Sequence, residues 1–141
     1  LLSTAVQTGF RESRRIRGSH TLSEEEYCRA VHFPDSVARG AHPIDIHYSA
    51  NTRQDVRFLE QAGYIPYRVM TIPGFRNLLT AGRCVSVDRA VFASIRVQAT
   101  AMALGQAAGT AAALCRRDGR AVGDADIAAL RTVLIRQGAD I

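Results

Sequence analysis

The chain has 141 residues, 47% of them apolar, which is enough for one folded domain and too apolar for a disordered segment. Its formal charge is +5, and all 18 basic residues are arginines that are scattered among acids without interleaved aromatic residues, so we expect no nucleic-acid partner. Residues 97–115 carry no charge over the length of a membrane span, but their alanines, glycines and polar residues would gain little in lipid, so we expect no membrane partner.

The chain has three cysteines, and no two of them form a CxxC pair. An odd number without paired spacing predicts neither a disulfide framework nor a metal site. Reduced thiols fit a cytoplasmic location. We interpret Cys84 as a small buried residue.

The first region, up to about Gly63, begins with an apolar stretch at residues 1–10, which is followed by the basic segment 11–17. Its arginines at 11, 14, 15 and 17 could bind a carboxylate or phosphate of a substrate, or pair with Glu12 and with the acids at 24–26. Thr21 and Glu24 have the spacing of a capping box, which predicts a helix through Tyr27. Residues 43–47 alternate apolar and polar residues and predict a half-buried strand.

The middle of the chain predicts two more strands. Residues 67–72 alternate like a strand, and residues 77–81 form a short apolar run, typical of a buried strand in the core of a sheet, that ends at Gly82.

The last region is expected to be helical. Ser94 is a plausible cap for a long helix that continues to about Cys115. Its alanines and glycines recur at helical spacing, which predicts a helix pressed closely on a sheet; they are Ala101, Gly105, Ala108, Gly109 and Ala112. A final helix is expected from about Asp124 to Gly138, with Ile127, Leu130 and Leu134 on one face.

A ligand could lie between the end of the 77–81 strand and the start of the long helix. A helix N-terminus presents unpaired amides and partial positive charge, and Gly82 allows a ligand to approach the chain closely. This geometry permits a cofactor but does not identify one. His47, at the end of a predicted strand, could act as a general acid or base, or be structural.

Several motifs resemble the C-terminal part of a family of bacterial FAD-dependent oxidoreductases with a glutathione-reductase-like FAD fold. They are NLLTAGRCVS at 77–86, ASIRV at 93–97, MALGQAAGTAAA at 102–113, and, upstream, RESRRI at 11–16, TLSEE at 21–25, ARG at 38–40, PIDIH at 43–47 and IPYR at 65–68. The resemblance implies an α/β fold. Residues 1–76 would be part of a mixed α+β substrate or cap domain. Residues 77–141 would be the C-terminal portion of a Rossmann-like FAD domain, with its last strand, its long helix and a terminal helix.

The resemblance also implies which residues bind FAD. Gly82 and Arg83 match the place where the family's chain meets the ribityl region. Four residues match the helix start that faces the pyrimidine edge of the flavin, where they would stabilise negative charge as the flavin is reduced: Ser94, Ile95, Arg96 and Val97.

The sequence departs from the family's pattern in having no GxGxxG turn among its 141 residues. The adenine and pyrophosphate end of FAD therefore has no site here, and the chain is expected to be a fragment, one chain of a split protein or a degenerate copy. The complete protein would transfer a hydride between a small organic substrate and flavin. The alternative is a non-catalytic remnant or interaction module. Its expected partner is the missing N-terminal FAD-binding half, or a second copy through self-association.

Overall fold

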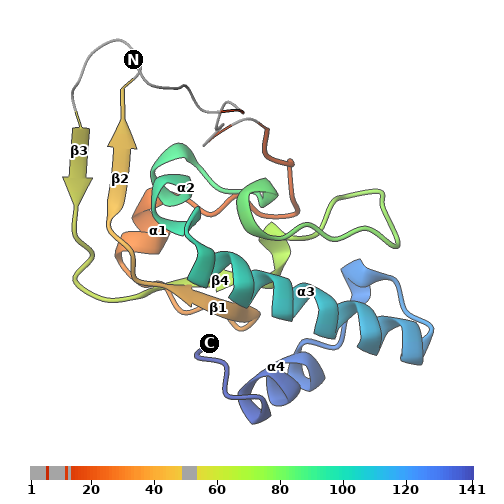
Figure 1. Cartoon of the computed structure of the whole chain (residues 1–141). Coiled ribbons are helices and arrows are strands. Elements are labelled where there is room, and N and C mark those ends of the chain that lie inside the picture. Colours follow the sequence, from red (N-terminus) through yellow and green to blue (C-terminus); the bar gives the residue numbers. More distant parts are fainter. Residues whose placement is uncertain (1–5, 7–11, 13, 49–53) are drawn as a thin grey trace.

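The computed structural model describes residues 6, 12, 14–48 and 54–141, and in this part of the chain helices and short strands are mixed (Figure 1). In chain order the elements are α1 (Glu24–Cys28), β1 (Ser36–Gly40), β2 (Ile44–His47), β3 (Gln54–Arg57), β4 (Gly63–Pro66), the 3-10 turns η1 (Tyr67–Val69) and η2 (Gly82–Cys84), α2 (Arg89–Ile95), α3 (Gln98–Asp118), the 3-10 turn η3 (Val122–Asp124) and α4 (Ile127–Arg136).

The strands form two antiparallel pairs. β1 pairs with β4, with Gly40 opposite Gly63, and β2 pairs with β3, with His47 opposite Gln54. The half-buried strand predicted at 43–47 is confirmed as β2, because Ile44 is buried while His47 is exposed. Each pair is two-stranded among the described residues, so the fold is mixed α/β with small antiparallel sheets.

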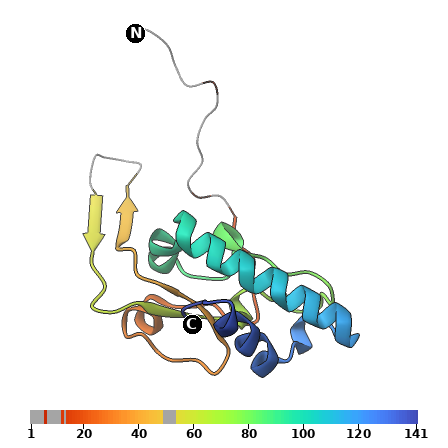
Figure 2. The ribbon, with the colours of Figure 1, turned by 60° about the horizontal axis from the view of Figure 1, so that its bottom comes forward.

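The core lies between the β1–β4 pair and the helices. α3 packs across β1, and α4 packs against α3 on the same side (Figure 2). The buried side chains of α3 follow helical spacing; they are Thr100, Leu104, Ala107, Ala111 and Cys115. The prediction that the small-residue face packs on a sheet was wrong for Gly105, Gly109 and Ala112, which are exposed, because the face that carries Leu104 is the one turned to the core.

The capping box of α1 is real but lies two residues later than predicted. The Ser23 hydroxyl accepts from the Glu26 amide, and the Glu26 carboxylate accepts from the Ser23 amide at 2.9 Å. The Thr21 hydroxyl instead lies 2.9 Å from the Ser86 hydroxyl. The helix starts later because Thr21 is engaged outside it.

Two helices replace the single helix predicted from Ser94. α2 is capped by Asp88, whose carboxylate accepts from the Val91 amide at 2.9 Å and from the Glu24 amide of α1 at 2.6 Å. Ser94 therefore lies inside α2 and caps nothing. Two residues, Arg96 and Val97, separate α2 from α3, and Val97 is at the N-cap position of α3.

The strands predicted at 67–72 and 77–81 were both wrong. Tyr67 begins a 3-10 turn, because its amide donates to Asp35 and its carbonyl accepts from Met70. The alternation that suggested a strand reflects the burial of side chains by that turn. Residues 77–81 form no strand and make a single bridge, between Leu79 and Thr71, and Leu78 is exposed. The prediction of the last Rossmann strand thus fails at these residues.

The C-terminal helix was predicted in the right place. α4 is capped by the Asp126 carboxylate, Leu130 and Leu134 are buried, and Gly138 has a φ of +83° just past the helix end. The proposed boundary at residue 76 stays a prediction. Cys84, which we predicted to be buried, is exposed, because η2 turns it towards solvent.

A buried tyrosine joins α1 to both the sheet and α2. Tyr27 lies against Gly40 and Gly63, where an added Cβ would come within 2.3 Å of the tyrosine side chain in each case. Its hydroxyl lies 2.9 Å from the Ser94 hydroxyl of α2. The paired glycines are therefore required by the close approach of this ring.

Candidate functional site

Asp45 of β2 connects two of the residues that the sequence singles out. Its backbone carbonyl accepts from the Arg96 guanidinium at 2.7 Å, and its side-chain Oδ2 lies 3.0 Å from His47 Nε2. Its Oδ1 accepts from the Gln54 amide at 2.7 Å. Arg96 and His47 come from motifs 49 positions apart in the sequence, and Asp45 holds them at one end of the molecule.

The environment of Asp45 keeps it ionised. The hydrogen bond from Gln54 is the main cause that lowers the pKa of Asp45, and slight burial opposes it. The hydrogen bond and charge of His47, and the charge of Arg96, lower the pKa of Asp45 further. A carboxylate that stays charged orients the imidazole of His47 through the 3.0 Å contact with Nε2.

Phe92 of α2 is the aromatic centre of the site. The Arg15 guanidinium lies 5.0 Å from the centroid of the Phe92 ring, and that of Arg96 lies 6.0 Å from it. Arg89, one turn earlier on α2, lies 5.4 Å from the ring centroid of Tyr48. Guanidinium groups are held against aromatic faces by cation–π attraction, which leaves their N–H groups available to other partners.

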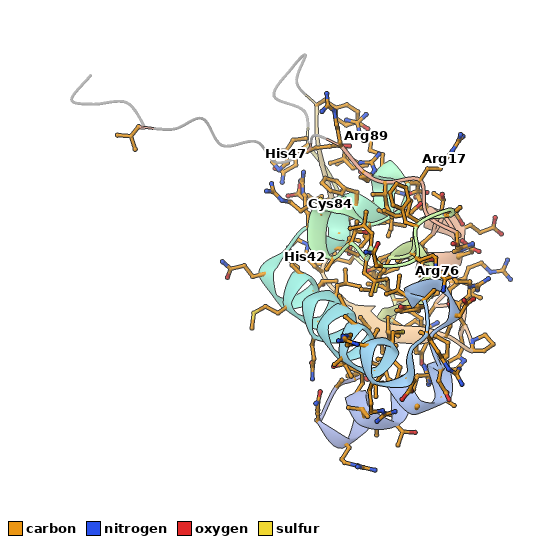
Figure 3. The ribbon with its side chains drawn as sticks, turned by 90° about the vertical axis from the view of Figure 1, so that its right-hand side faces the viewer. Arg17, His42, His47, Arg76, Cys84 and Arg89 are labelled. Atoms are coloured by element: carbon orange, nitrogen blue, oxygen red, sulfur yellow. The ribbon has the colours of Figure 1, made fainter. Side chains whose placement is uncertain are left out.

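A cavity of about 20 Å³ lies beside Phe92, Arg89 and Arg96. Its lining residues are Glu12, Asp45, Ile46, His47, Arg89, Phe92, Ala93 and Arg96. Figure 3 shows His47 and Arg89 side by side at this end of the molecule, whereas Arg17 points away from it. Larger hollows of about 510 and 520 Å³ lie elsewhere, beside Cys28 and beside Asp35, and neither is lined by His47 or by a residue predicted to bind FAD.

The arginines of segment 11–17 were expected either to bind an anion of the substrate or to pair with acids of the chain, and among the described residues of this segment only Arg15 makes contacts that bear on this choice. Arg15 pairs with Glu12 and also contacts Phe92, so it is both ion-paired and part of the site. Arg14 and Arg17 are exposed. Arg11 lies outside the described residues.

Gly82 and Arg83 lie beside the start of α3. Gly82 opens η2 with a φ of +63°, a conformation that favours glycine, and a Cβ added there would lie 3.6 Å from the Ala101 Cβ in the first turn of α3. Arg83 follows it on the exposed side of the turn. The predicted proximity of this loop to the long helix is thus what the structure shows.

A model of the FAD dependent oxidoreductase family matches residues 1–134. The chain belongs to this family. Its cofactor is therefore FAD. No curated protein and no solved structure matches the chain. No helix among the described residues of this family member is long and apolar enough to cross a membrane, and those residues contain no group of three or more side chains that could hold a metal ion.

The residues of this oxidoreductase chain fit a flavin unevenly. Ser94 and Ile95 are buried inside α2, and the Ser94 hydroxyl donates to the His42 carbonyl, so their side chains face the core. The Arg96 amide donates to Phe92 at 3.2 Å. The first amides of α3 follow Val97, whose side chain carries no acceptor that could cap them. The fitting groups are the Arg96 guanidinium and the α3 start. The role of the six predicted residues in binding FAD stays a prediction.

Two members of the site were missed, although the sequence contains a signal for both. Asp45 and His47 are two residues apart on a strand, which places their side chains on the same face. Phe92 and Arg96 are four apart, the spacing of neighbours on one helix face. The second signal was hidden because the start of α2 was not recognised.

Proposed function

We propose that the chain is the C-terminal part of an oxidoreductase that moves a hydride between a small organic substrate and flavin. The observation that carries the proposal is the position of Asp45, which contacts both Arg96 and His47. The Arg96 cation can stabilise negative charge on one reacting group, while the imidazole of His47, oriented by Asp45, can exchange a proton with another.

Arg96 would hold the pyrimidine edge of the flavin. Its Nη2 donates to the Asp45 carbonyl, which fixes the side chain and leaves further N–H groups of the guanidinium to a ligand. When bound, FAD supplies the acceptor or donor of the hydride. The Arg96 cation lowers the energy of negative charge that develops beside it.

His47 would exchange the proton. Because Nε2 faces the Asp45 carboxylate, it carries the hydrogen, and Nδ1 is left to take a proton from a substrate hydroxyl or amine. The side chain is 42% exposed, so a substrate can reach it.

The rest of the FAD site would come from an N-terminal half that carries a GxGxxG turn, in a Rossmann-like domain to which α3 contributes. Met102, Gly105 and Gly109 lie on the exposed face of α3, opposite the core, and this supports a partner there. The same face supports self-association of the chain when that half is absent.

The test is flavin binding and flavin redox potential. The purified chain, with and without the coding region upstream of it, is mixed with FAD and separated from free flavin, and its visible spectrum is recorded. The form that retains flavin is compared with its Arg96→Ala variant and with Arg136→Ala, which changes an exposed arginine of α4.

We expect Arg96→Ala to lower the two-electron potential of the bound flavin by about 30 mV, equivalent to a loss of about 1.4 kcal/mol of stabilisation of the reduced form. The Arg136→Ala variant should keep the parent potential. An unchanged potential in Arg96→Ala would contradict the role of Arg96, and no flavin on either form would contradict the oxidoreductase proposal.

A further inference from the structure

The cavity beside Phe92 has more positive than negative charge around it. Its lining residues carry two guanidinium groups, Arg89 and Arg96, and two carboxylates, Glu12 and Asp45. Arg15 lies outside the lining but pairs with Glu12, so with its charge included three guanidinium groups face two carboxylates. Protonation of His47 would add to the excess. The uncompensated charge favours an anionic ligand.

The two carboxylates are already engaged. Asp45 accepts from Gln54 at 2.7 Å and lies 3.0 Å from His47, while Glu12 pairs with Arg15. Among the described residues, the Arg96 guanidinium hydrogen-bonds to the neutral Asp45 carbonyl and acts on the Asp45 carboxylate only through its charge, and Arg89 contacts an aromatic ring. Arg89 and Arg96 are therefore the cations that can receive an anion, and both line the cavity.

The size of the cavity limits which anion enters. A space of about 20 Å³ holds about one water-sized group. One oxygen of a carboxylate is about the size of the group that this space holds. A carboxylate has two oxygens in one plane, whereas a phosphate monoester has three oxygens in a tetrahedral arrangement, so the carboxylate needs less room around the cavity. Planar guanidinium groups also match carboxylates in geometry.

We propose that Arg89 and Arg96, beside Phe92, form a carboxylate-binding subsite, in which Arg96 shares its remaining N–H groups between this carboxylate and the flavin, and that the substrate of the proposed oxidoreductase is a small carboxylate. The inference rests on the proposed function only in calling this ligand the substrate. The carboxylate would be held at the cavity, which leaves the rest of the molecule outside it, next to the exposed imidazole of His47.

The test uses three probes that share a phenyl ring and differ in the head group: benzoate, the neutral benzamide, and phenyl phosphate. Each is titrated into the 141-residue chain, labelled with ¹⁵N-arginine and free of FAD, at constant ionic strength. The Nε–H signals of Arg89 and Arg96 report binding at the site. Arg136→Gln is the control for Arg89→Gln, because both change an exposed arginine on a helix.

We expect benzoate to shift both signals saturably, benzamide to leave them unchanged, and phenyl phosphate to bind more weakly than benzoate. Arg89→Gln should weaken benzoate about tenfold or more, as expected for the loss of a charged hydrogen bond, whereas Arg136→Gln should not change it. Equal response to benzamide, tighter binding of phenyl phosphate, a shift that never saturates, or equal loss in the two variants would each overturn the proposal.

The result can be separated from the fate of the proposed function. Benzoate binding is measured without flavin, so a chain that fails to bind FAD contradicts the oxidoreductase proposal and leaves the benzoate result intact. Flavin binding without benzoate binding would overturn the carboxylate subsite alone.

Discussion

Replacing Gly63 by alanine should damage the fold more than any ordinary glycine-to-alanine change, because the Tyr27 ring occupies the space that the new methyl group needs. A Cβ at Gly63 would lie 2.3 Å from Tyr27 Cδ2, 2.4 Å from Cε2 and 2.7 Å from the Tyr27 carbonyl oxygen. Cβ contacts below 3.0 Å are essentially never seen, and Tyr27 is fully buried, so its ring has no free space to move into.

The expected loss follows from these contacts. Overpacking of a buried site costs about 1–3 kcal/mol. Gly63→Ala belongs at the upper end, about 3 kcal/mol, because one of the clashing atoms belongs to the backbone. Tyr27→Phe keeps the ring and loses only the hydroxyl that contacts Ser94 at 2.9 Å, so it should cost about 1 kcal/mol.

The assay is urea unfolding monitored by circular dichroism, with the free energy of unfolding taken from each midpoint at an unchanged m value. Gly105→Ala is the matched control, because nothing lies within 4 Å of a Cβ at Gly105 in the middle of α3. That variant should be more stable by about 0.5–1 kcal/mol. A Gly63→Ala protein within about 0.5 kcal/mol of the parent would refute the close approach of Tyr27.

Two further predictions concern titration and reactivity. Gln54→Ala should raise the pKa of Asp45, because it removes the main hydrogen bond that lowers it; the stability that ionised Asp45 contributes, present above its ordinary pKa of 3.8, would then be lost at a higher pH on acidification than in the parent. Carboxyl NMR titration checks this, and an unchanged pKa would contradict it. Burial raises the pKa of the Cys115 thiol, whereas Cys84 is exposed, so a thiol reagent should modify Cys84 first in the native chain. Equal native rates at the two cysteines would be inconsistent with this packing.

The sequence predicted best those elements that depend on local signals. The alternation at 44–47 and the capped, amphipathic helix of Leu130 and Leu134 both formed where expected. Such signals need no knowledge of distant residues, because burial periodicity and capping act within one element.

The predictions failed where distant contacts decide the conformation. Asp35 receives the Tyr67 amide and the Arg68 side chain, and the chain there turns instead of extending as a strand. The 77–81 segment lacks the neighbouring strands that a sheet would need among the described residues. Asp88 was overlooked as the cap of α2 although its partner, the Val91 amide, is only three positions away, whereas its contact with the Glu24 amide of α1, 64 positions away, has no local signal.

The same separation limited prediction of the site. His47 and Arg96 were identified as candidates from their motifs, but nothing in the spacing of the motifs showed that one backbone carbonyl and one carboxylate of Asp45 would join them. The contact between the Phe92 ring and the Arg15 guanidinium likewise joins two distant parts of the chain, and no local pattern indicates it.

The exposed face of α3 has a consequence for the entropy of any surface that covers it. Gly105, Gly109 and Ala112 have no side-chain rotamers to lose, so immobilising this stretch against another surface costs almost no side-chain conformational entropy. Met102 is the one flexible apolar side chain of the face, at 74% exposure. Most of the side-chain conformational entropy lost on contact would therefore come from the opposing surface, and an opposing surface with rigid side chains would lose the least.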